Sequence, residues 1–226
     1  MNIKTAGAAL MIMFVAGCGA GPPAQRAAAT SVPAAGPSAA GPSVVGSSAA
    51  GPSAAPPGDG SQCDLPVRFD IADGWTTKAI DVSTINDKLL AGMFRTGPFD
   101  TICSVNGKPA GVDGFVRVYF SDIGAGNPRD NLKVYVHTDT LGPLDEVKYE
   151  VRAAKYRDLT IGGAPAAEVT WNRRTIATKA STKYTAFSLD TPKGTVIVVL
   201  MPFTTKDYAD VLPAYELARS TLTVNP

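Results

Sequence analysis

Apolar and polar residues alternate along several segments of the chain from residue 63 onward, as they do in half-buried β-strands. Segments with this pattern, or with a short apolar run, are residues 66–71, 75–80, 89–94, 101–105, 115–120, 147–153, 156–161, 165–171, 184–189 and 195–201. Residues 196–200 are apolar at every position, which predicts a strand in the centre of the sheet, covered on both faces. Turn sequences at Asn106-Gly107 and at residues 190–194 favour antiparallel hairpins.

Two other segments have the spacing of helices. Asn127 followed by Pro128 is typical of a helix start, and apolar residues then recur three and four positions apart. A last helix is expected to begin at residues 204–205, with Asp207 in its first turn and a kink at Pro213. Together these segments predict an α+β fold, a mostly antiparallel β-sheet with one or two packed helices.

The first residues have the composition of an export signal. Lys4 precedes an apolar run at 6–16, which is far shorter than the roughly 20 residues that cross a bilayer. The run ends in Val15-Ala16-Gly17-Cys18, which resembles the lipobox of bacterial lipoproteins. This resemblance implies cleavage before Cys18, attachment of a glycerolipid to its thiol, and acylation of the new amino group with a fatty acid such as palmitate. We therefore expect a lipid anchor in the cell membrane, with the protein on the extracytoplasmic face.

A segment rich in Ala, Gly, Pro and Ser follows, with a repeated Ala-Gly-Pro-Ser sequence. Only Arg26 and Asp59 are charged in it, so it cannot bury enough apolar surface to offset the entropy of ordering. We expect a disordered tether that spans about 35–40 Å on average; a low-complexity segment whose length has no function is the alternative. The chain thus divides into a signal peptide (1–17), the lipidated cysteine with its tether (18–62), and a globular domain (63–226).

Cysteine number supports the same organisation. The chain has three cysteines, and an exported protein with an odd number has one unpaired thiol. Lipidation of Cys18 leaves Cys63 and Cys103, which we expect to form a disulfide outside the cytosol. A redox pair or a metal site is the alternative, but the chain has no C-x-x-C sequence and no histidine near either cysteine.

Charge and residue types argue against several functions. The chain has 21 basic and 20 acidic side chains, and without Lys4, Arg26 and Asp59 the domain is neutral, unlike a typical nucleic-acid binder. His137 is the single histidine, which excludes a histidine-cluster metal site. Neither the nucleophile sequence G-x-S-x-G nor, within the domain, S-x-x-K occurs. We expect no catalytic residues, no metal, no cofactor and no nucleic-acid partner.

Two groups of residues are candidates for binding. Positive charge between two predicted strands at Arg173, Arg174, Lys179 and Lys183 could meet an anionic headgroup, a cell-wall polymer or an acidic protein. The aromatic residues Trp75, Tyr119 and Trp171 could line an apolar pocket between sheet and helix. A solvated hairpin and an ordinary core are the respective alternatives.

Short apolar motifs indicate a family. Asp73-Gly74-Trp75 after a strand, Ile161-Gly162-Gly163-Ala164-Pro165-Ala166 before one, and the final residues 220–224 are similar to the PsbP/Mog1-like fold, in particular to the LpqN type of actinobacterial lipoprotein. The resemblance implies a non-enzymatic accessory or binding protein of the cell envelope and transfers no catalytic residue. We expect a monomer that binds an envelope protein or lipid. A carrier of a hydrophobic small molecule or lipid, in a cavity between sheet and helix, is the alternative.

Overall fold

The computed structural model describes residues 63–123, 126–139 and 148–226. The segments predicted to be the signal peptide, the lipobox and the tether lie outside these residues. No helix formed by the described residues is both long and apolar enough to cross a membrane.

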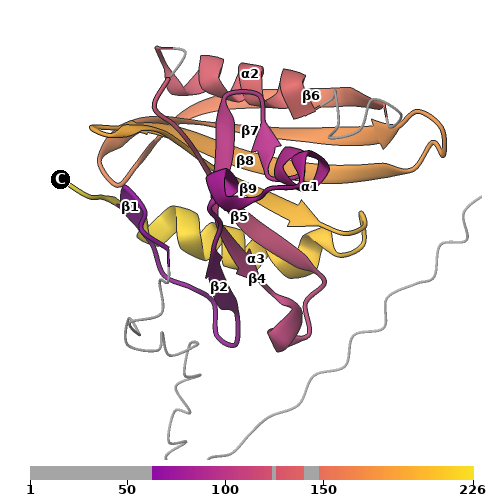
Figure 1. The fold of residues 1–226 in the computed structure, drawn as a ribbon, viewed down its shortest axis with the longest axis horizontal. Helices are drawn as coiled ribbons and strands as arrows, with labels where there is room; N and C mark the ends of the chain where they lie inside the picture. Colours follow the sequence, from indigo (N-terminus) through magenta and orange to yellow (C-terminus); the bar gives the residue numbers. More distant parts are fainter. Residues whose placement is uncertain (1–62, 124–125, 140–147) are drawn as a thin grey trace, which may run out of the picture. The chain divides into compact units, whose positions relative to one another are not determined.

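Eight strands form one antiparallel sheet (Figure 1). The order across it is β2 (Thr76–Ala79), β4 (Phe99–Asn106), β5 (Gly114–Ser121), β9 (Gly194–Pro202), β8 (Ser181–Thr191), β7 (Ala164–Thr175) and β6 (Tyr149–Ile161), while β3 (Arg95–Thr96) pairs with β4. A separate two-stranded sheet joins β1 (Val67–Arg68) to β10 (Thr223–Val224). The mostly antiparallel α+β fold expected from the sequence is therefore confirmed.

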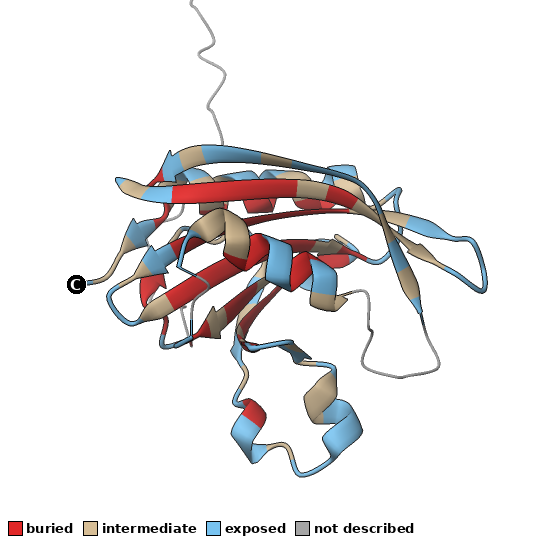
Figure 2. Cartoon of the chain, turned by 90° about the horizontal axis from the view of Figure 1, so that it is seen from above, coloured by how far each residue is buried: buried red, intermediate tan, exposed pale blue. Residues whose placement is uncertain are grey.

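Strand β9 lies in the middle of the sheet, as its apolar run predicted. Val196, Val198 and Leu200 face one hydrophobic cluster, and Ile197 and Val199 face a second cluster on the opposite side, because successive side chains of a strand point to opposite faces. Helix α3 (Tyr208–Thr221) contributes to the first cluster and helix α2 (Pro128–Asp139) to the second. The two helices lie on opposite faces of the sheet, and buried residues follow the strands between them (Figures 1 and 2).

Side-chain hydrogen bonds to the backbone occur near the first residues of α2 and α3. The Asp130 N–H donates to Asn127 Oδ1 at 2.9 Å, which confirms the predicted start of α2. Regular helix α3 starts at Tyr208, a few residues later than predicted, after a turn at residues 205–207. In this turn the Asp207 side chain accepts from the Thr204 N–H at 2.7 Å, as in a capping box. Pro213 lies within α3 without ending it.

The prediction of a strand at residues 89–94 is wrong. This segment forms the short helix α1 (Lys88–Gly92), because the Asp87 carboxylate accepts from the N–H groups of Leu89 and Leu90 and caps it. The 3-10 turns η1 (Val82–Thr84) and η2 (Lys108–Ala110) were also unforeseen, and η2 replaces the two-residue turn expected after Asn106.

Two strand predictions differ in extent. The strand expected at residues 66–71 shortens to β1, whose only strand partner among the described residues is the two-residue β10. Residues 149–161 form one long strand in place of two, with a bulge between Arg152 and Lys155 and Ala153 at a φ of 52°.

The predicted disulfide is confirmed. Cys63 and Cys103 are bonded, with their Cα atoms 5.7 Å apart, and Cys103 lies within β4. The bond fixes residue 63, where the domain begins, to the sheet. The Asn225 side chain also donates to the Leu65 carbonyl at 2.8 Å, so the start of the domain is held by both a covalent and a hydrogen bond.

Candidate functional site

The three aromatic residues proposed for a pocket do not come together. Tyr119 and Trp171 are buried beneath α2, where the Tyr135 ring lies 5.1 Å and 6.4 Å from theirs. Trp75 packs on the opposite face of the sheet, against the cluster that includes α3. Because the strands alternate their side chains between the two faces, these residues belong to two separate cores and line no common pocket.

Arg173, the first residue of the predicted positive patch, is engaged in a buried ion pair. It donates to Asp139 at 3.0 Å and to the Tyr184 hydroxyl, and its guanidinium lies 4.5 Å from the rings of Tyr149 and Tyr184. The side chains of Arg173 and Asp139 are only 20% and 12% exposed. Burial raises the pKa of Asp139 above its usual value, although the charge of Arg173 opposes the shift. This pair fastens the end of α2 to the sheet and leaves Arg173 little surface for a partner.

The rest of the patch is divided in the same way. Arg174 points to the α3 side of the sheet and lies 3.7 Å from Glu150. Lys183 points to that side too, with its ammonium 4.1 Å from the Tyr208 ring. Lys179 is exposed in the turn between β7 and β8. The structure therefore groups Arg174 with Lys183 and separates both from Arg173.

A polar groove lies on the α3 side of the sheet, over β6, β7 and β8. Helix α3 packs mainly on β9, β5 and β8, which leaves β6 and β7 largely uncovered on this face. The groove has a volume of about 470 Å³ and is lined by Ala153, Lys155, Tyr156, Arg157, Glu168, Thr170, Trp171, Asn172 and Lys183. A larger concavity, of about 680 Å³, lies beside the Cys63–Cys103 disulfide, where residue 62 joins the domain.

Glu168 is buried and forms one wall of the groove. Its Oε1 accepts from the Tyr215 hydroxyl at 3.1 Å and from Arg219 at 2.5 Å, while its Oε2 accepts from Arg157 Nε at 2.6 Å. Burial, and then the negative charge of Glu168, raise the pKa of Tyr215 well above its usual value. The carboxylate thus joins α3 to β6 and β7.

Positive charge exceeds negative charge around the groove. Its surroundings on this face carry four arginines and two lysines. The arginines Arg152, Arg157, Arg174 and Arg219 share the carboxylates Glu150 and Glu168, and Arg219 also interacts with Glu216. The lysines are Lys155 and Lys183. Neither lysine forms an ion pair with a carboxylate of the described residues. The excess is local, because the domain as a whole is neutral.

Hydrogen-bonding groups lie between the two lysines. The hydroxyls of Thr170 and Thr185 are 3.2 Å apart, the Thr185 hydroxyl is 2.7 Å from that of Tyr208, and Asn172 adds an amide to the wall. Ammonium, hydroxyl and amide donors converging on one open groove are suited to phosphate or carboxylate groups.

The part of this groove that comes from β6 was not predicted from the sequence. Lys155 and Arg157 are two residues apart on one strand, a spacing that places both on one face. That spacing was a usable signal, but only the pairing of β6 with β7 brings them beside Thr170 and Glu168. Among the described residues, no group of three or more His, Cys, Asp or Glu side chains could hold a metal ion.

The solved structures that are similar to this chain include the following three. LpqN from Mycobacterium tuberculosis, a protein involved in cell envelope biogenesis, has a TM-score of 0.44 and 8% identity over 71% of this chain and 83% of its own. The PsbP protein of Synechocystis has a TM-score of 0.45 and 12% identity over 70% and 86%. A Pseudomonas aeruginosa protein of unknown function has a TM-score of 0.36 and 16% identity over 50% and 74%. LpqN and PsbP are also the two kinds of protein that the sequence motifs resemble.

A comparison with curated proteins found no match. The family model described as "uncharacterised lipoprotein" matches residues 33–222, which include the whole eight-stranded sheet, both long helices and the groove. This chain therefore belongs to that lipoprotein family.

Proposed function

We propose that this protein is a non-catalytic binding protein of the cell envelope, held by lipid on the extracytoplasmic face of the membrane. Membership of a lipoprotein family supports the anchor, and Cys18 is the residue we assign to it. Cys18 directly follows the predicted signal peptide, and the other two cysteines are bonded to each other. Several acyl chains at about 0.8 kcal/mol per buried CH₂ hold a protein durably in a bilayer.

The roles of the buried charged residues support binding rather than catalysis. Glu168 ties α3 to the sheet, and the Arg173–Asp139 pair ties α2 to it from the other face. Both carboxylates are occupied by arginines that hold the fold together. We therefore assign a structural role to the carboxylates of Glu168 and Asp139.

The observation that carries the proposal is the groove over β6, β7 and β8. Lys155 and Lys183 flank Thr170 and Asn172 on a sheet surface that no helix of the described residues fully covers. A ligand with phosphate or carboxylate groups fits this chemistry, because ammonium groups attract it and the neutral donors orient it.

We expect the mature, full-length protein to bind short polyphosphate and polyglutamate, and the double variant Lys155→Glu/Lys183→Glu to bind at least about tenfold more weakly, since two attractive charges become repulsive. Isothermal titration calorimetry at two salt concentrations measures both affinities. Binding should weaken with salt, as it does for any largely electrostatic contact.

A matched control separates the groove from net charge. Lys78→Glu/Lys108→Glu makes the same change of charge at two exposed lysines near the other edge of the sheet, on β2 and η2. This control should keep nearly the affinity of the parent. Equal losses in the two double variants, or no binding by the parent protein, would contradict the assignment of the groove.

A further inference from the structure

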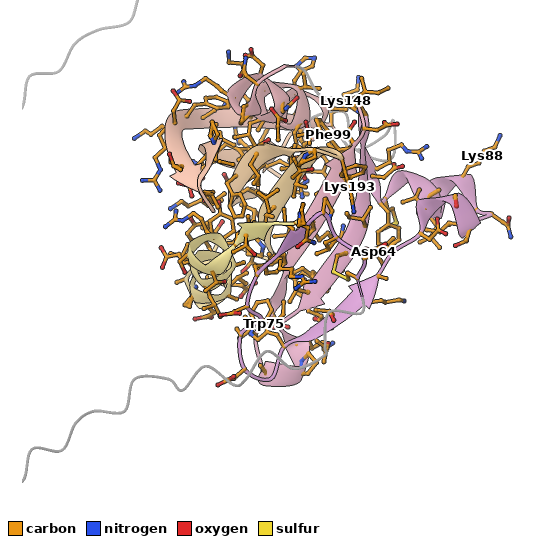
Figure 3. All side chains as sticks on the ribbon, turned by 90° about the vertical axis from the view of Figure 1, so that its left-hand side faces the viewer. Asp64, Trp75, Lys88, Phe99, Lys148 and Lys193 are labelled. Carbon is orange, nitrogen blue, oxygen red and sulfur yellow. A yellow bond between two sulfur atoms is a disulfide. The ribbon has the colours of Figure 1, made fainter. Side chains whose placement is uncertain are left out.

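An arm projects from the sheet between β2 and β4 and exposes an apolar surface. We define the arm as residues 81–97, which contain η1, α1 and β3. Figure 2 shows it standing away from the sheet with most of its residues exposed or intermediate, and Figure 3 shows Lys88 far from the body of the domain. Helix α1 buries none of its residues.

Three large apolar side chains are concentrated at the tip of the arm. Leu89, Leu90 and Met93 are 51%, 46% and 54% exposed. Leu89 and Met93 are four residues apart on one side of the short helical turn, with Leu90 beside them. Single exposed apolar residues are common on protein surfaces, whereas three within five residues form a patch of the kind that contacts a partner or a membrane.

The base of the arm, in contrast, is firmly held. Val82 is buried, Arg95 donates to Asp100 at 2.5 Å and 3.1 Å, and the Thr101 N–H donates to the Phe94 carbonyl at 2.7 Å. The apolar tip therefore stays exposed because the base fixes the arm away from the sheet.

The lipid tether joins the domain beside this base. Cys63 is bonded to Cys103, which pairs with Ala79 at the end of β2. The next residue, Ile80, donates its N–H to the Ile102 carbonyl at 3.0 Å, and the arm then begins. The disulfide thus places the attachment point of residues 18–62 next to the root of the arm.

We propose that the tip of the arm inserts into the membrane that holds the lipid anchor; this inference rests on the proposed function. The tether confines the domain near the bilayer, so that insertion of even a small apolar tip is an intramolecular step. The arm has two basic residues, Lys88 and Arg95, and two acidic ones, Asp81 and Asp87, so insertion depends on apolar contact rather than on anionic lipid.

Insertion at this edge would also orient the domain. The arm lies at the β2 and β4 end of the strand order, and the groove lies over β6, β7 and β8 at the other end. A domain that contacts lipid through the arm presents its groove away from the membrane, toward ligands of the envelope rather than toward lipid headgroups.

The test uses the full-length lipoprotein in vesicles of phosphatidylethanolamine and phosphatidylglycerol with brominated acyl chains, which quench tryptophan on contact. Leu90→Trp reports from the arm. Ile176→Trp reports from an equally exposed apolar position in the turn between β7 and β8, and the parent chain gives the baseline for Trp75 and Trp171. We expect bromine-dependent loss of emission for Leu90→Trp and none above baseline for Ile176→Trp.

Four further measurements make the result decisive. The loss of tryptophan emission should persist in vesicles of phosphatidylethanolamine and phosphatidylcholine, because the arm is neutral. In the Leu90→Trp variant, the loss of emission should become smaller when Leu89→Ser and Met93→Ser are added. Cosedimentation with vesicles reports the anchor separately. Protein that cosediments without quenching at the arm would overturn this inference and leave the anchor intact, whereas protein that fails to cosediment would overturn the anchor. A dimer in native mass spectrometry that depends on the three apolar residues, without quenching, would assign the patch to a second copy and also overturn the inference.

Discussion

Replacing Glu168 with Ala should destabilise the domain by about 3–5 kcal/mol, because one partner of a buried charged network is removed. The Tyr215 hydroxyl is fully buried and would lose its acceptor. Arg219 and Arg157 would also face one another without the carboxylate that they share. Such a loss is a large fraction of the stability of an ordinary domain. Urea unfolding followed by circular dichroism measures it.

Two matched variants separate the network from its individual contacts. Glu168→Gln keeps an acceptor for Tyr215 but loses the charge, so we expect it to lower the free energy of unfolding by an intermediate amount. Arg157→Ala removes a partner whose side chain is 63% exposed, and such pairs contribute at most about 1 kcal/mol. If Glu168→Ala unfolded at the same urea concentration as Arg157→Ala, the structural role that we assign to the Glu168 carboxylate would be contradicted.

Removal of the disulfide should lower the free energy of unfolding by a similar amount. The double variant Cys63→Ser/Cys103→Ser opens a loop with a sequence separation of 40, and the entropy model assigns such a loop about 4 kcal/mol. For a domain of this size that corresponds to a fall in Tm of roughly 10 °C. Differential scanning calorimetry of the variant and of the oxidised parent gives the difference.

Removal of the disulfide should weaken one part of the domain more than the rest. Leu65 and Val67 are buried in the core of the α3 side, and they follow Cys63 directly. Amide exchange in residues 63–71 should therefore accelerate more than in β9. Full reduction of the parent protein should reproduce the result. A reduced parent as stable as the oxidised one would show that the bond contributes nothing to stability.

The sheet was largely predictable because its core strands have distinctive patterns. Five successive apolar residues at 196–200 marked β9 as central, and Asn127-Pro128 marked the start of α2. Both signals are local: four of the five residues at 196–200 are β-branched, which favours a strand, and proline favours the first turn of a helix.

The arm was mispredicted for a physical reason. Residues 89–94 are apolar enough for a strand, but periodicity over so short a run does not separate strand from helix. Asp87 was the available signal, since an Asp before such a run is typical of an N-cap. The exposure of Leu89 and Leu90 could not have been read from the sequence, because it depends on the arm leaving the sheet.

The groove was predictable only in part. Arg174 and Lys183 were identified as positive residues, but so was Arg173, which turns to the other face and pairs with Asp139. The difference between neighbours such as Arg173 and Arg174 is set by which face of β7 each occupies. That in turn depends on strand register, which no local pattern specified.

The most direct test of the account is the mass of the amino-terminal peptide from the mature protein in the membrane fraction. We expect this peptide to begin at Cys18 and to carry a thioether-linked diacylglycerol and an amide-linked acyl chain. We also expect Cys18→Ala to abolish both modifications and to release the protein from the membrane. A mature protein with an unmodified Cys18 thiol, or a Cys18→Ala variant that stays equally bound to the membrane, would contradict it.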